Sequence, residues 1–142
     1  MRVQSKPYSA RRLLLGVFVL SAVSVYSYAV QAANTQLPIP RGVPMKSWQE
    51  NGSGGRYLLQ VIQGQALKAG KTVVGTVTSD TDCDVDAEGL SHCHNTIELS
   101  SGEKITVIDT HNMHINRCLG VGEKLSLTAV SGSWIMGALP GK

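Results

Sequence analysis

Short segments that alternate polar and apolar residues dominate the second half of the chain. The clearest are residues 95–99 and 104–109, and residues 123–130 show the same alternation. An alternation of period two predicts strands with one buried face. A β-branched run over residues 72–78 predicts a further strand. Residues 134–136 predict a last short one.

The segment 56–67 is short and apolar, so its pattern fits either a strand or a helix, and Gly64 favours a strand slightly. Five or six short strands with regularly spaced turns predict an all-β fold, either a small barrel or a sandwich. We favour a five-stranded barrel of the oligonucleotide/oligosaccharide-binding type, because Gly75 inside a strand is typical of the bends in small barrels. This expectation concerns the fold and implies no function.

The strands at 95–99 and 104–109 predict a hairpin. A three-residue loop with a glycine, residues 101–103, suits the connection. This loop puts the apolar residues of both strands on one buried face, which supports the register. The predicted cross-strand pairs are Leu99 with Ile105, Ile97 with Val107, Asn95 with Asp109, and Cys93 with His111.

The first 32 residues have the pattern of a secretory signal peptide. Their basic start is followed by an apolar run from Leu13 to Val30. Small residues ending at Ala32 fit the pattern that a signal peptidase cleaves. Cleavage would leave a periplasmic or secreted protein. An uncleaved run of about 18 residues would instead anchor the chain in a membrane.

Removal of this leader changes the charge. The whole chain has 13 Lys and Arg against 10 Asp and Glu, a net of +3. Residues 1–32 hold 4 of the basic residues and none of the acidic ones, so 9 − 10 leaves a net of −1. Nucleic-acid binding needs a basic face, and we therefore expect no nucleic-acid partner.

Residues 33–55 predict a flexible arm between the leader and a β-domain at 56–142. Three prolines in the arm oppose regular structure, and residues 51–55 are rich in glycine. Met45 and Trp48 are the exceptions, because both could dock on the domain.

Three cysteines follow the leader, Cys83, Cys93 and Cys118. An exported protein meets an oxidising compartment, so we expect one disulfide and one remaining thiol. We favour a Cys93–Cys118 bond, with Cys83 left over, because it would join the two segments that carry histidine. A Cys83–Cys93 bond is the alternative.

The four histidines of the chain all lie between positions 92 and 114. Imidazole and thioether groups bind transition metals, and the hairpin would bring both halves of this segment to one end of the domain. We predict five metal ligands, namely His92, His94, His111, Met113 and His114. Copper is the preferred ion for His and Met in an oxidising compartment. Zinc is the alternative if the cysteines are reduced.

These features predict an exported protein that binds copper for carriage, buffering or resistance and is not an enzyme. The alternative is an accessory domain without metal that docks on a membrane or envelope protein. A thiol enzyme is a third reading, because Cys93 opposite His111 has the residue types of a nucleophilic site. The acidic residues between 80 and 89 lack the spacing of a calcium loop, so we expect a solvated loop there.

Overall fold

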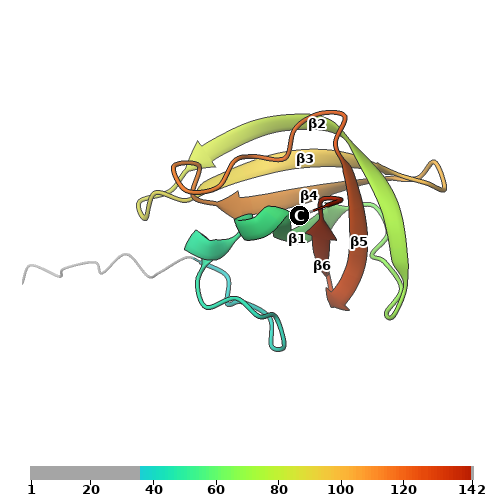
Figure 1. The fold of residues 1–142 in the computed structure, drawn as a ribbon, viewed down its shortest axis with the longest axis horizontal. Coiled ribbons are helices and arrows are strands. Elements are labelled where there is room, and N and C mark those ends of the chain that lie inside the picture. The colour runs from blue at the N-terminus through green and yellow to red at the C-terminus, as the bar shows by residue number, and fades with distance from the viewer. Residues whose placement is uncertain (1–35, 142) are drawn as a thin grey trace, which may run out of the picture. The chain divides into compact units, whose positions relative to one another are not determined.

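Six antiparallel strands form within residues 36–141, the part of the chain that the computed structural model describes. Their bounds are β1 Arg56–Gln63, β2 Thr72–Val85, β3 Ser91–Leu99, β4 Lys104–His111, β5 Lys124–Ser131 and β6 Trp134–Ala138. The order is β1-β4-β3-β2-β5-β6, and β6 pairs with β1, so the sheet closes into a ring (Figure 1). The prediction of an all-β fold with up to six strands is confirmed. The leader assigned to residues 1–32 lies outside the described residues.

β2, with 14 residues, is the longest strand, and its two halves lie beside different neighbours. Its first residues lie beside β5 and its later ones beside β3 (Figure 1). A Cβ atom on Gly75 would lie 2.5 Å from Cγ2 of Ile97, so the inward-facing side chains leave no room for a larger residue. Gly75, expected from the sequence to mark a bulge or a bend, is thus required for packing. The bulge itself lies two residues later, between Val77 and Ser79.

The loop of the β3–β4 hairpin begins one residue earlier than predicted. Leu99 N–H donates to the carbonyl of Glu103 at 2.8 Å, so the loop comprises residues 100–102. Gly102 then occupies its last position with φ 88°. A three-residue hairpin loop needs a left-handed residue there, which explains why this register is adopted.

The predicted register of that hairpin is therefore wrong by two residues. Ile97 lies opposite Ile105, and Cys93 lies opposite Asp109. His111, expected opposite Cys93, faces Ser91 instead. A shift of two residues leaves the same side chains on the inner face, so the predicted buried face is confirmed.

The acidic segment predicted as a loop is partly strand. Residues 80–85 belong to β2, and a register shift interrupts its pairing with β3 between Thr81 and Asp84. Asp82, within this bulge, has φ 52°, a left-handed conformation that residues other than glycine seldom adopt. The sequence has a loop-like composition here because a bulged, exposed strand end tolerates acidic residues.

The inner face of the ring changes from apolar to polar along β3 and β4. At one end a core of aliphatic side chains and Tyr57 fills the ring, including Leu59, Val77, Ile97, Ile105, Val107, Leu125, Leu127 and Ile135. Towards the other end the buried inner residues are Asn95, Cys93, Asp109 and His111. Since polar side chains are costly to bury, this end is where chemistry is to be sought.

The described part of the N-terminal arm packs on the strands. It contains two short 3₁₀ turns, η1 (Trp48–Glu50) and η2 (Ser53–Gly55). Trp48 is buried against Leu58, and its ring centroid lies 5.6 Å from that of Trp134. Met45 is partly buried against the same cluster, so both residues expected to dock do so. Trp48 thus covers the outer face of β1.

Candidate metal and thiol site

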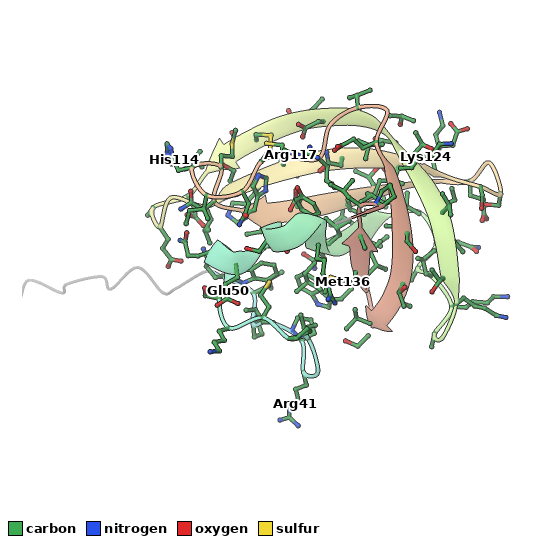
Figure 2. All side chains as sticks on the ribbon, in the orientation of Figure 1. Arg41, Glu50, His114, Arg117, Lys124 and Met136 are labelled. Carbon is green, nitrogen blue, oxygen red and sulfur yellow. A yellow bond between two sulfur atoms is a disulfide. The ribbon has the colours of Figure 1, made fainter. Side chains whose placement is uncertain are left out.

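Three sulfur atoms meet at the polar end of the ring. A disulfide joins Cys83 to Cys93, and Cys118 is a free thiol. The Sγ atom of Cys118 lies 3.9 Å from that of Cys93, and all three sulfur atoms lie within 4.8 Å of one another. Figure 2 shows the disulfide as a yellow bond. The cluster offers three soft ligand atoms in one place.

The favoured Cys93–Cys118 bond is corrected to the alternative pairing. β2 and β3 are neighbours, and the bulge between Thr81 and Asp84 places Cys83 beside Cys93 with their Cα atoms 4.0 Å apart. Cys118 arrives on the segment between β4 and β5, which is not paired with β3. Adjacent strands therefore decide the pairing, and the sequence alone gave no sign that residue 83 lay on one of them.

The three cysteines differ in exposure. Cys93 is fully buried on the inner face of β3. Cys83 and Cys118 are both half-buried. Solvent therefore reaches the cluster by way of Cys83 and Cys118, and an incoming ion or thiol would meet these two first.

Acidic side chains surround the sulfur atoms. The Oδ1 atom of Asp80 lies 3.6 Å from Sγ of Cys83. Burial raises the pKa of the Cys118 thiol, and the negative charges of Asp80 and Asp109 raise it further. Cys118 is therefore a neutral thiol at neutral pH, which makes it a weak nucleophile. This weighs against the nucleophilic thiol enzyme considered from the sequence.

A buried acid–base pair adjoins this cluster on β4. His111 Nδ1 lies 3.2 Å from Asp109 Oδ2, and both side chains are fully buried. Burial lowers the pKa of His111, but the contacts with Asp109 and the charge of Asp80 together raise it more, so the net pKa is raised. Burial also raises the pKa of Asp109, and the opposing effect of His111 is smaller. Because the pKa values of both His111 and Asp109 are raised, the folded pair holds a proton tightly.

Amide side chains connect this pair to its surroundings. Asn51 Nδ2 lies 3.3 Å from Asp109 Oδ1, and Asn95 Nδ2 donates to Asp80 Oδ1 at 3.0 Å. Within residues 36–141, the buried atoms Asn95 Oδ1, Asp109 Oδ2 and both ring nitrogens of His111 have no well-aligned hydrogen-bond partner. The polar end of the ring is thus incompletely satisfied, as interiors that hold water or ligands are.

Two of the predicted ligands, His92 and His94, lie on the outer face of β3. His92 Nδ1 lies 2.9 Å from Thr110 Oγ1, and its Nε2 lies 2.9 Å from Asp86 Oδ2. His94 Nδ1 lies 3.9 Å from Asp82 Oδ2. Both ring nitrogens of His92 are therefore engaged, and side-chain alternation separates these two histidines from the inward-facing His111.

The other predicted ligands lie on the loop after β4. Met113 is 49% exposed, and His114 is exposed at the edge of the molecule (Figure 2). In the described part of the chain, the one group of three or more His, Cys, Asp or Glu whose ligand atoms all lie within 4.8 Å of one another is the cysteine cluster. The five predicted ligands are thus not gathered as a set.

The sequence pattern predicted that the cysteines brace the histidine site. The signal that could have identified the cluster is the presence of three cysteines between positions 83 and 118. No helix among residues 36–141 is long and apolar enough to cross a membrane. No protein-family model, characterised protein or solved structure matches this chain. The function must therefore be argued from the site itself.

Proposed function

We propose that this protein binds copper through Cys83, Cys93 and Cys118, and that it serves in copper carriage, buffering or resistance. The observation that carries the proposal is the meeting of three sulfur atoms within 4.8 Å of one another. Ligand atoms that converge before an ion arrives lower the cost of organising a site.

The donor set favours Cu(I). Thiolates are soft ligands and select Cu(I) or zinc among biological metals. Structural zinc sites almost always have four protein ligands, whereas this cluster has three sulfur atoms. Asp80 and Asp109, whose charges raise the pKa of Cys118, would also attract a cation. Zinc remains the alternative ion, with a fourth ligand supplied from outside the cluster.

Cu(I) binding requires the Cys83–Cys93 disulfide to be reduced, because a disulfide sulfur is not a thiolate. Binding would then displace the thiol protons, as metals deprotonate coordinated thiols. The reduced protein is therefore the form that takes up the ion. We retain the predicted histidine and methionine ligands only as competing positions, with His92 and His94 on the outer face, Met113 and His114 on the loop and His111 on the inner face.

We also propose that the leader directs export to the periplasm or exterior, as its sequence predicts. The disulfide is compatible with an oxidising compartment. For the fold, we propose a barrel of the oligonucleotide/oligosaccharide-binding type. The consecutive pairing of β2, β3 and β4, with the β5–β6 hairpin returning beside β2, supports this assignment. β1 would be an additional strand between β6 and β4.

The test is anaerobic titration of the reduced full-length chain with Cu(I) against a colorimetric Cu(I) chelator. We expect one ion per chain, and a loss of affinity of about tenfold or more for Cys118→Ser, comparable with the loss on removing other metal-site groups. The matched control is a His94→Gln, His114→Gln double variant, which should bind as the wild type does.

Two outcomes would overturn the proposal. If the histidine variant loses copper while Cys118→Ser retains it, the ion binds at the site predicted from the sequence. If the wild type competes for neither Cu(I) nor zinc, the accessory domain that docks on a membrane or envelope protein becomes the better reading.

A further inference from the structure

We propose that Cys83 is a redox modification site, at which a cationic dithiol reductant attacks the Cys83–Cys93 disulfide. Its chemistry is independent of any metal. Its consequence, the opening of a three-thiol copper site, rests on the proposed function.

The exposure of the two bonded cysteines decides which sulfur is attacked. Cys93 is fully buried on the inner face of β3, so an external thiolate cannot reach it without opening the ring. Cys83 is half-buried and lies in the bulge of β2, where pairing with β3 is interrupted. Attack at Cys83 therefore leaves the folded ring intact.

The free thiol of Cys118 does not perform this step itself. In-line attack on Cys93 needs the attacking sulfur on the far side of Cys93. With Cys118 Sγ 3.9 Å from Cys93 Sγ and an S–S bond of about 2 Å, that line would put Cys118 about 6 Å from Cys83. Cys118 lies within 4.8 Å of both sulfur atoms, so the three form a triangle and not a line. The arrangement suits joint ligation of one ion better than internal exchange.

Charge around Cys83 decides which reductants can approach. Asp80 lies against its sulfur atom, and the side chains of Asp82 and Asp84 on either side are exposed. An attacking thiolate is an anion, and these carboxylates repel it unless its carrier is positively charged. The repulsion acts over about 30 Å at 0.01 M salt and about 3 Å at 1 M. This acidic rim would therefore select a cationic thiol.

The exchange balances as two thiol–disulfide steps. The first thiolate of the reductant forms a bond to Cys83 Sγ. The Cys83–Cys93 bond breaks, and its electron pair leaves on Cys93 Sγ, which takes up a proton. The second thiolate of the reductant then attacks the reductant sulfur that is bonded to Cys83. Cys83 leaves as a thiolate and takes up a proton. Two electrons have passed to the protein, and the reductant has become a disulfide.

The experiment compares cysteamine, a cationic thiol, with 3-mercaptopropionate, an anionic one, on the oxidised full-length chain. Rates are expressed per thiolate, and mixed disulfides are trapped with acid and mapped by peptide mass spectrometry. The Cys118→Ser variant simplifies the map. Wild-type protein whose Cys118 has first been alkylated provides a second form if that variant folds poorly.

We expect the mixed disulfide at Cys83 and a cysteamine rate about tenfold or more above that of 3-mercaptopropionate at low salt. The preference should disappear at 1 M salt. It should also fall in an Asp82→Asn, Asp84→Asn double variant. Glu98→Gln removes an exposed acidic charge elsewhere on β3 and is the matched control.

A mixed disulfide mapped to Cys93 would overturn the inference, as would a disulfide that reacts only after denaturation. Equal rates for the two thiols at low salt would refute the charge selection. These outcomes are separable from those of the copper titration. If Cys83 reacts as expected but the reduced chain binds no copper, the proposed function fails and the redox site stands.

Discussion

Replacement of Asn51 by alanine tests whether the polar end of the ring depends on the N-terminal arm. Asn51 is fully buried, although it comes from a glycine-rich segment. Its Oδ1 accepts from Leu58 N–H at 2.6 Å. Its Nδ2 lies 3.0 Å from the carbonyl of Leu58 and 2.8 Å from that of Thr110. One side chain thus connects the arm, β1 and β4.

The magnitude follows from these three backbone contacts. Each hydrogen bond contributes about 1 kcal/mol net, and a buried group left unpaired costs about 1–3 kcal/mol. The Asn51→Ala change should therefore lower the free energy of unfolding by about 3 kcal/mol. For a domain of this size that corresponds to a fall in Tm of roughly 10–20 °C.

Urea unfolding followed by tryptophan fluorescence measures this change. Asn116→Ala is the matched control, because the half-buried Asn116 makes one hydrogen bond to Gln49, 3.2 Å long, and should cost about 1 kcal/mol. A loss for Asn51→Ala no larger than that of the control would refute the reasoning.

An Asn51→Asp variant extends the test, because it would set a second carboxylate beside Asp109. Like charges at such a separation repel strongly when buried. We expect the variant to be at least as unstable as Asn51→Ala at pH 7 and to recover part of its stability as pH falls. A pH-independent loss would contradict the placement of these two side chains.

Two further predictions concern the core and the buried pair. Gly75→Ala should destabilise the fold by about 1–3 kcal/mol, because the new Cβ would lie 2.5 Å from Ile97 Cγ2. Gly120→Ala serves for comparison, because its new Cβ would first meet the side chain of Glu123 at 3.4 Å, and calorimetry ranks the two. The raised pKa of His111 means that the folded state binds its proton more tightly than the unfolded state does, so this stabilisation is complete below about pH 6.5 and is lost as pH rises through the folded pKa. Urea unfolding of metal-free protein between pH 6 and 8 should show this decline in the wild type and in His114→Gln but a smaller one in His111→Gln, and equal slopes in all three would refute it.

The strands could be predicted because alternation and β-branched runs are local signals. The stretches around Ile97, Val107 and Leu125 became strands with the expected faces buried. The order of the strands around the ring could not be predicted, because it depends on long-range pairing. The register of the hairpin failed for a smaller reason, the position of Gly102 within its loop. A shift of two residues keeps the same apolar side chains on the buried face. The apolar pattern therefore could not distinguish the two registers.

The candidate site was harder to predict, because it depends on departures from regular structure. The acidic residues around Asp82 are typical of a loop, so the strand that carries Cys83 was not predicted. The bulge there also interrupts the alternation of polar and apolar residues by which strands are predicted. The histidines formed the more visible cluster in the sequence. Alternation then put His92 and His94 on the outer face of β3, while His111 became part of the buried polar end.

The bulge gives the two proposals a common structural origin. A regular strand after Thr81 would keep its pairing with β3 and offer no interruption at which Cys83 stays accessible. The shift between Thr81 and Asp84 instead leaves Cys83 half-buried beside the fully buried Cys93. One sulfur can then be reached by a reductant, while the other is held on the inner face near Cys118. Bulges commonly re-aim a side chain next to a functional site, and here the same irregularity supports both reduction of the disulfide and ligation of an ion by its products.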